Sequence, residues 1–188
     1  MNRQFKVIAA VGMNTGIIGS TLSNSIPWRI PSDLAFFKTT TLDSTIVMGS
    51  RTYDSLNNRN LPRRRNVVLT RNPDSIKGKP DAIYTSFEDA LKYEDPNLFV
   101  IGGSHIYQEC LRFNPKTFYL TVVDDSAIRP SGSLETDVCF PINGNDVLYR
   151  RDRDVKIGNS LYAVSSEGSW EFENGFVYKF VELNNTAF

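Results

Sequence analysis

Short apolar runs alternate with polar, glycine-containing and proline-containing stretches along this chain. Runs rich in β-branched and aromatic residues predict strands at residues 5–11, 45–49, 66–70, 83–84, 98–101, 117–123 and 176–183. Helical spacing and helix-start residues predict helices from Pro31, over 50–56, after Ser86 and over 104–112, with Ser50 or Thr52 able to cap the second. Residues 5–11 are apolar almost throughout, so we expect that strand at the centre of a sheet.

The order of these elements predicts an α/β fold with a central, mostly parallel twisted sheet and flanking helices. The strands at 117–123 and 176–183 should pair antiparallel and form a C-terminal antiparallel edge. No repeat, low-complexity tract or linker divides the sequence, so we expect a single domain over 1–188. Residues 14–25 and 125–137 are expected to be loops, the first a mobile lid, and the charged run 150–154 a solvated surface.

Composition narrows the partner to a small molecule. Among 188 residues, 40% are hydrophobic, and Lys plus Arg equal Asp plus Glu at 21 each, which gives no electrostatic reason to expect nucleic acid or a membrane. Cys110, Cys139 and the single His105 are too few for a disulfide framework or a zinc site. The sequence shows no signal peptide or membrane span, so we expect a soluble cytoplasmic protein.

The segment IPWRIPSDLAFFK, residues 26–38, carries the strongest candidate for a chemical group. Pro31 fixes its own φ and lacks an N–H, so a helix should begin there. Asp33 then shares a helix face with Phe36 and Phe37. A carboxylate among rings loses hydration unless donors pair with it, which points to a ligand with N–H groups. The alternative is that Asp33 only caps the helix or complements its dipole.

A second candidate is the glycine pair Gly102-Gly103, which lies between a predicted strand and a predicted helix. This layout can turn backbone N–H groups and a helix N-terminus toward a phosphate. The alternative is an ordinary tight turn, because the full GxGxxG fingerprint is absent.

Several stretches together resemble the dihydrofolate reductase family, in the order that the family has them and along nearly the whole chain. The matching stretches are VIAAVG at 7–12, IPWRIPSDLAFFK at 26–38, IVMGSRTYDSL at 46–56, LPRRRNVVLTR at 61–71, FVIGGSHIY at 99–107, FYLTVV at 118–123 and DVCFP at 137–141. The resemblance implies NADPH-dependent reduction of dihydrofolate to tetrahydrofolate, with hydride transfer to pterin C6 and protonation of N5. Antifolates should bind, and we expect a monomer.

The resemblance also implies roles for residues that the pattern alone would assign to the core or surface. Asp33 would grip the 2-amino group and N3 of the pterin, Thr121 would bond the same end, and Trp28 would hold an ordered water. Burial should raise the pKa of Asp33. Arg64 would pair with the glutamate carboxylate of the substrate. The remaining substrate-binding positions are apolar: Ile8, Ala9, Ile26, Leu34, Phe37, Leu56, Leu61 and Ile101. Arg63 departs from the family, because a glycine is frequent there.

For the cofactor, the resemblance implies a pyrophosphate-binding turn at Gly102 and Gly103, a phosphate contact at Thr52 and a tyrosine, Tyr107, beside the nicotinamide. Arg51 and Arg71 lie where the family contacts the 2′-phosphate, which favours NADPH over NADH. The other cofactor positions are Ala10, Ile18, Gly49, Thr70, Ser104, His105 and Ile106.

Two other functions remain open at this point. A riboflavin-pathway reductase would have a similar fold and also use NADPH, but it gives no reason for Asp33 beside Trp28 and Phe37, or for Arg64. A non-catalytic relative could bind nucleic acid through the turn at 63–65, although zero net charge argues against it. Tight binding of methotrexate would favour dihydrofolate reduction over the riboflavin-pathway reductase, and a steep fall of nucleic-acid affinity with salt would support the non-catalytic relative.

Overall fold

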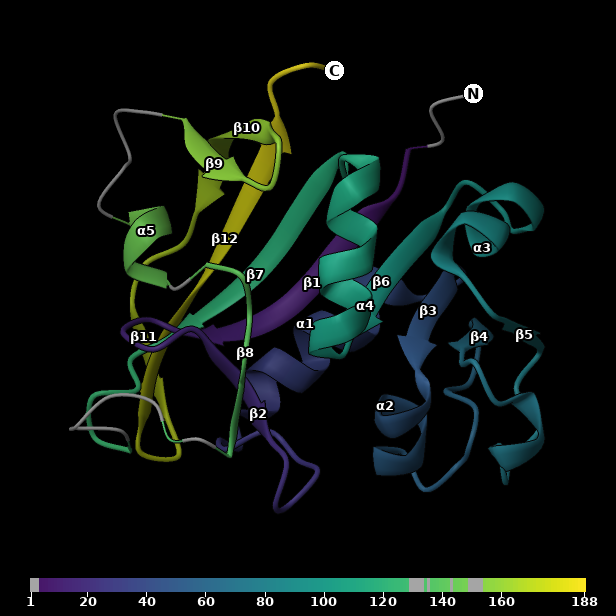
Figure 1. The fold of residues 1–188 in the computed structure, drawn as a ribbon. Helices are drawn as coiled ribbons and strands as arrows, with labels where there is room; N and C mark the ends of the chain where they lie inside the picture. The colour runs from purple at the N-terminus through teal and green to yellow at the C-terminus, as the bar shows by residue number, and fades with distance from the viewer. Residues whose placement is uncertain (1–3, 129–133, 135, 143, 149–153) are drawn as a thin grey trace.

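The computed structural model describes residues 4–128, 134, 136–142, 144–148 and 154–188 (Figure 1). Within these residues a ten-stranded sheet runs in the order β5-β4-β3-β6-β1-β7-β12-β10-β9, and β11 pairs with β12 beside this path. The strands of this sheet are β1 Lys6–Gly12, β3 Thr45–Gly49, β4 Arg65–Leu69, β5 Ala82–Tyr84, β6 Leu98–Gly102, β7 Thr117–Val123, β9 Val155–Ile157, β10 Ser160–Glu167, β11 Glu171–Glu173 and β12 Phe176–Asn185.

The half of the sheet from β5 to β7 is parallel, and the half beyond β7 is antiparallel. β1 lies between β6 and β7, with Val7 next to Val100 on one side and Phe118 on the other. β7 and β12 pair antiparallel, with Thr121 opposite Phe180. The predicted α/β fold, its central first strand and its antiparallel C-terminal edge are therefore confirmed.

The helices begin close to where the sequence predicts them. They are α1 Pro31–Thr41, α2 Ser50–Ser55, α3 Phe87–Tyr93, α4 Ser104–Cys110 and α5 Gly144–Leu148, with 3₁₀ turns η1 Pro73–Ser75 and η2 Leu111–Phe113. The Ser86 hydroxyl caps α3 by accepting from the Asp89 N–H at 3.1 Å. The expected cap of α2 is wrong, because Gly49 is its N-cap and no side chain bonds there.

Alternating side chains of the sheet build two cores on its two faces. On one face, Val7, Ala9 and Val11 of β1 pack with residues of α3, α4 and α5. On the other face, Ile8 packs with residues of α1 and α2. Figure 1 shows α4 in front of the sheet and α1 behind it. The helix that carries Asp33 therefore faces the side chain of Ile8.

The sequence did not predict several short elements. The predicted loop at 14–25 contains β2, Ile17–Ser20, which pairs antiparallel with β8, Asp137–Cys139, in a separate two-stranded sheet. Elements α5, β9, β10 and β11 lie outside the predicted loop and the charged run, in stretches for which the sequence predicted no element. Residues 129–133 and 135 of the predicted loop and 150–153 of the charged run lie outside the described residues, and Asp154 is exposed.

Cys110 and Cys139 are both free thiols, the first buried and the second half-buried. In the part of the chain that the structure describes, no helix is both long and apolar enough to cross a membrane.

Candidate active site

Asp33 and Thr121 meet, although they lie on α1 and β7 and are 88 residues apart. The Thr121 hydroxyl donates to Asp33 Oδ1 at 2.6 Å. Asp33 does not cap its helix, because Ile30 is the N-cap and no side chain makes a capping bond there. The capping interpretation of Asp33 is therefore wrong, and its carboxylate points to the sheet.

Burial raises the pKa of Asp33 above its ordinary value, and the hydrogen bond from Thr121 opposes this rise by favouring the ionised form. The predicted direction is confirmed. The buried carboxyl therefore holds its proton to a higher pH than an exposed aspartate does, a property that suits proton delivery.

Trp28 lies beside this segment with only 6% of its surface exposed. Among the described residues none accepts a hydrogen bond from its buried Nε1–H. Trp28 packs with Ile30 and Tyr178. A buried N–H without a protein acceptor is uncommon and is the kind of group that binds ordered water.

Most of the predicted apolar lining gathers on the α1 face of the sheet. Packed together there are Ile8, Phe37, Leu56, Leu61 and Ile101. Ile26 and Leu34 expose 47% and 57% of their surface, respectively. Ala9 differs from this group, because the alternation of β1 places it in the core of the opposite face.

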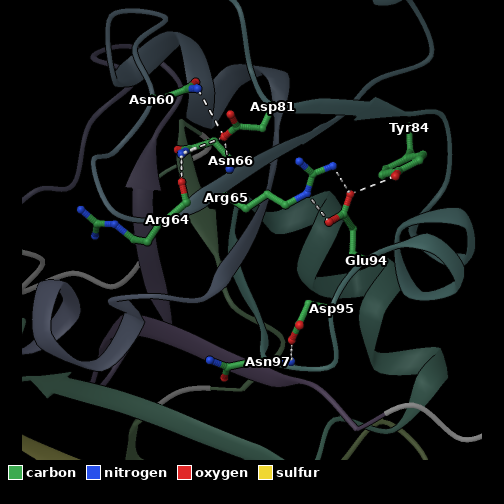
Figure 2. Close-up of polar contacts among 9 residues, drawn as sticks. All are labelled: Asn60, Arg64, Arg65, Asn66, Asp81, Tyr84, Glu94, Asp95 and Asn97. Carbon is green, nitrogen blue, oxygen red and sulfur yellow. Dashed lines mark hydrogen bonds and ion pairs between the residues drawn. The ribbon is translucent and has the colours of Figure 1, made fainter.

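A buried asparagine shapes the turn that presents Arg64. Asn66 is 0% exposed, accepts from the Leu61 N–H at 2.9 Å and donates to the carbonyls of Leu61 and Arg64 at 3.0 and 2.8 Å. Its own N–H donates to Asp81 at 2.7 Å. Figure 2 shows Arg64 extending to one side of this turn and Arg65 to the other.

The three arginines of this turn have different partners. Arg65 donates through Nε and Nη2 to the two carboxylate oxygens of Glu94. Arg63 pairs with Asp43 at the surface. Arg64 donates to the Pro62 carbonyl at 3.1 Å and to the Thr41 hydroxyl at 3.2 Å. Its Cζ atom lies 5.9 Å from the centroid of the Phe37 ring. Within the described residues Arg64 thus has neutral acceptors and no carboxylate partner, although burial lowers its pKa.

Arg63 adopts φ 56°, in the left-handed region that favours glycine. Arg63 therefore takes the backbone conformation that a glycine would take at this position, and its side chain adds strain.

The predicted cofactor residues cluster where β3, β4 and β6, adjacent parallel strands, reach their carboxyl ends. Gly49, Arg51 and Thr52 follow β3, Thr70 and Arg71 follow β4, and Gly102, Gly103, Ser104, His105, Ile106 and Tyr107 end β6 and begin α4. Arg51, Arg71 and His105 are exposed. In open α/β sheets, ligands bind outside the carboxyl ends of the strands.

Glycines allow these turns to pack closely against side chains of neighbouring elements. Gly102 has φ 115° and precedes a cis peptide bond to Gly103, and a Cβ on Gly102 would lie 3.2 Å from the Tyr107 hydroxyl. That hydroxyl donates to the Ile8 carbonyl at 2.9 Å, which ties α4 to β1. A Cβ on Gly103 would meet Thr52 Oγ1 at 3.5 Å. The glycine pair and Thr52 therefore border one another.

The two remaining predicted cofactor positions lie on β1 and β2. Ala10 belongs to the cluster around Trp28, and Ile18 on β2 packs against the core on the α4 face. Ser104 uses its hydroxyl within the protein, donating to the Cys139 carbonyl at 3.1 Å.

Sequence reasoning missed polar residues that hold this site in place. Asp125 is 0% exposed and accepts from the backbone N–H groups and side chains of Asn14 and Thr15, at the start of the predicted lid. Glu173 contacts the first turn of α1. Asn66 could have been suspected, as a polar residue at the start of an apolar run, but Glu173 lies in an exposed strand with no apolar pattern.

The comparisons with known proteins decide the family. The dihydrofolate reductase family model matches residues 4–154 of this chain. The chain belongs to the dihydrofolate reductase family. This membership confirms the family, enzyme class and reaction predicted from the ordered motifs, and it favours dihydrofolate reduction over the two alternatives.

Related dihydrofolate reductases extend this result. That of Mycobacterium tuberculosis (strain ATCC 25618 / H37Rv) is 41% identical over 120 residues, 63% of this chain and 71% of the relative. The type 3 enzyme of Salmonella typhimurium is 39% identical over 144 residues, covering 72% and 76%. A bifunctional dihydrofolate reductase-thymidylate synthase of Paramecium tetraurelia is 26% identical over 190 residues, 98% of this chain and 35% of the relative.

A solved dihydrofolate reductase from Enterococcus faecalis, complexed with NADP(H) and RAB-propyl, has the same fold. It superposes with a TM-score of 0.71 at 24% identity and covers 99% of this chain and 98% of its own.

Proposed function

We propose that this chain reduces 7,8-dihydrofolate with NADPH and that Asp33, Thr121 and Trp28 form its catalytic group. The observation that carries the proposal is the 2.6 Å bond from Thr121 to a buried Asp33, against an apolar wall that includes Phe37. A carboxylate so placed can accept paired hydrogen bonds from the 2-amino group and N3 of a pterin. Thr121 stands on the adjacent strand to bond the same end of the ring.

The chemistry divides between the cofactor and the protein. NADPH, when bound, supplies the hydride that goes to pterin C6. Asp33 orients the ring and favours its protonated form, and Trp28 offers its buried N–H to a water through which N5 gains a proton. Apolar side chains around the ring exclude other water and strengthen these hydrogen bonds.

Arg64 would hold the carboxylate of the substrate's glutamate. Its guanidinium is fixed by the Thr41 hydroxyl and the Pro62 carbonyl, both neutral, so its positive charge is available to an anion. The remaining contacts would come from the apolar positions Ile8, Ile26, Leu34, Leu56, Leu61 and Ile101, and from the backbone at Ala9.

The residues at the carboxyl ends of β3, β4 and β6 fit a dinucleotide. Glycines at 49 and 102 allow α4 to pack closely on these turns, since a Cβ at Gly49 or Gly102 would crowd Ile106 or Tyr107. The Thr52 hydroxyl borders Gly103 and is offered to a phosphate, whereas the Ser104 hydroxyl already donates to the Cys139 carbonyl. Arg51 and Arg71 follow adjacent strands and expose their guanidinium groups, as a 2′-phosphate requires.

The test of this function is a spectrophotometric assay of NADPH oxidation with dihydrofolate. We expect dihydrofolate-dependent oxidation that methotrexate abolishes. Folded protein that oxidises NADPH no faster than a protein-free blank would contradict the proposal. NADPH oxidation that depended on a riboflavin-pathway heterocycle and resisted methotrexate would instead support the riboflavin-pathway reductase.

Arg51 and Arg71 should set the preference for NADPH over NADH. Changing both to Ala removes two charge-assisted bonds to the 2′-phosphate, each worth about 1.5–3 kcal/mol before solvent screening. Because both side chains are exposed, we expect the Kd for NADPH to rise about tenfold per arginine and the Kd for NADH to stay unchanged. Fluorescence titration of both dinucleotides measures this.

The matched control for that experiment is Arg112→Ala. Arg112 is also exposed but lies on η2, after the far end of α4 and away from the carboxyl ends of the strands. It should leave both dissociation constants unchanged. Equal weakening of NADPH and NADH by the double change would show that the two arginines do not read the 2′-phosphate.

We further propose a cytoplasmic monomer in which residues 1–188 form one dihydrofolate reductase-like domain. The continuous sheet from β5 to β9 supports one domain. The zero formal net charge and the small-molecule reaction support a protein without nucleic-acid or membrane partners.

A further inference from the structure

The helix that carries Asp33 lacks the local cap that helices usually have. Ile30, at the N-cap, has no polar side chain, and Pro31 has no N–H. The first amide of the helix, the Ser32 N–H, donates instead to Glu173 Oε2 at 2.9 Å. Glu173 is the last residue of β11 and lies 141 residues further along the chain. A distant strand therefore supplies the acceptor that an N-cap side chain would normally give.

The hairpin of β11 and β12 holds this segment by further contacts. The Asn174 side chain donates to the Arg29 carbonyl at 3.3 Å. Trp28 and Ile30 pack with Tyr178 and Phe176 of β12. The hairpin thus contacts the entry to α1 through both polar and apolar groups, immediately before Asp33.

The same strand, β12, also supports the other partner of Asp33. Phe180 of β12 pairs with Thr121 of β7, and its ring centroid lies 4.4 Å from that of Phe36 on α1. Asp33 is consequently placed between two contacts from strands that both pair with β12: the bond from Thr121 of β7, and the bond from Ser32 to Glu173 of β11. A shift of the first helical turn would move Asp33 relative to Thr121.

We propose that Glu173 is a positioning residue for Asp33, acting by accepting the Ser32 N–H and holding the first turn of α1 against the sheet. This inference rests on the proposed role of Asp33 in dihydrofolate reduction. Without the acceptor, the Ser32 N–H must find water, the first turn frays, and the Asp33 carboxyl becomes more hydrated and less well aligned with Thr121.

Hydration of Asp33 has a defined sign. Because burial is the larger cause of its shifted pKa, added hydration lowers that pKa toward the ordinary value, and we expect this to outweigh the weaker Thr121 hydrogen bond, whose loss acts in the opposite direction. Loss of the negative charge of Glu173 acts in the same direction. Among the described residues, the ionisable groups on the elements packed against α1 and on its own segment include Arg29, Lys38, Tyr53, Arg64, Tyr107, Tyr119, Glu171, Glu173 and Tyr178.

The experiment compares Glu173→Ala and Glu173→Gln with the parent. We measure single-turnover hydride transfer against pH, the ¹³C titration of the Asp33 carboxyl carbon, and thermal melts. For Glu173→Ala we expect the Asp33 pKa to fall, the pH profile to shift to lower pH, and hydride transfer at neutral pH to slow roughly three- to tenfold. Glu173→Gln keeps an acceptor oxygen and should recover most of the rate.

Glu171→Gln is the matched control, because Glu171 lies on the same strand and carries the same charge, and the amide oxygen can still accept from the Tyr178 hydroxyl that Glu171 binds at 2.8 Å. It should leave the Asp33 titration at the parental pH. In an Asp33→Asn background, Glu173→Ala should no longer slow hydride transfer, since its target is gone.

A Glu173→Ala protein with a parental Asp33 titration and rate profile would overturn the inference, even if it melted at a lower temperature. The same shift in Glu171→Gln would also overturn it, because the effect would then belong to charge on the hairpin. A parent protein that does not oxidise NADPH with dihydrofolate would instead contradict the proposed function, while the ¹³C titration would still test the link between Glu173 and Asp33.

Discussion

Arg64→Ala should raise the KM for dihydrofolate about thirtyfold while leaving kcat nearly unchanged. A guanidinium paired with a carboxylate contributes about 2 kcal/mol when partly desolvated, and every 1.4 kcal/mol is tenfold. The bond is made equally in the ground state and the transition state, because the glutamate is remote from the reacting atoms. A pterin substrate that lacks the glutamate should show no change in KM.

The neighbouring arginines provide the control for this prediction. Arg63→Ala removes the same charge one residue earlier, but Arg63 pairs with Asp43 in solvent, with 65% and 66% of the two side chains exposed. Such pairs contribute little, so its KM should stay within about twofold of the parent. An equal loss for dihydrofolate and the bare pterin in Arg64→Ala would show that Arg64 supports the fold and does not bind the glutamate.

Local pattern was sufficient for the elements whose side chains face a core. Residues 45–49 and 117–123 are nearly all buried, so their apolar runs match β3 and β7 residue for residue. Pro31 likewise fixed the start of α1. By contrast β11 is short and exposed on two of its three residues, and β2 is only half-buried, so neither has an apolar period to detect.

The candidate site could be assembled from the sequence only through the family resemblance. Nothing in the local pattern relates Thr121 to Asp33, because their contact depends on the register of β7 beside β1 and β12. The resemblance supplied that pair and Arg64. It could not supply Glu173, since the contact with Ser32 joins an uncapped helix to a strand that carries no motif.

Asp33→Asn should slow hydride transfer at neutral pH about a hundredfold or more, which is the usual contribution of a positioned acid or base. The amide can still accept a bond from Thr121, but it offers no charge to the N–H groups of a pterin and does not favour the protonated ring. The rate of the variant should rise as pH falls, because solution acid then supplies the proton. Single-turnover measurements across pH test this, with Asp54→Asn, an exposed helical acid, as the control.

Thermal melts of the parent and Asp33→Asn test a second expectation. Because Asp33 is buried, the sign of the difference between their melting temperatures can be predicted. The folded-state pKa of Asp33 is raised, so protonation stabilises the fold below the unfolded-state pKa and this stabilisation is lost as pH rises through the folded-state pKa. Above that value the parent carries a poorly hydrated charge, whereas the Asn variant is neutral at every pH. The variant should therefore melt at an equal or higher temperature at neutral pH, and the difference should vanish in acid.

The combination of slower chemistry with an undiminished melting temperature separates a catalytic carboxylate from a helix-start acid. An acid that only complements the helix dipole would lose a few tenths of a kcal/mol on neutralisation and leave the rate unchanged. Parental hydride transfer in Asp33→Asn, together with a lower melting temperature at neutral pH, would return Asp33 to that structural role. Asp33 would then serve the helix, and the proton would have to reach N5 without it.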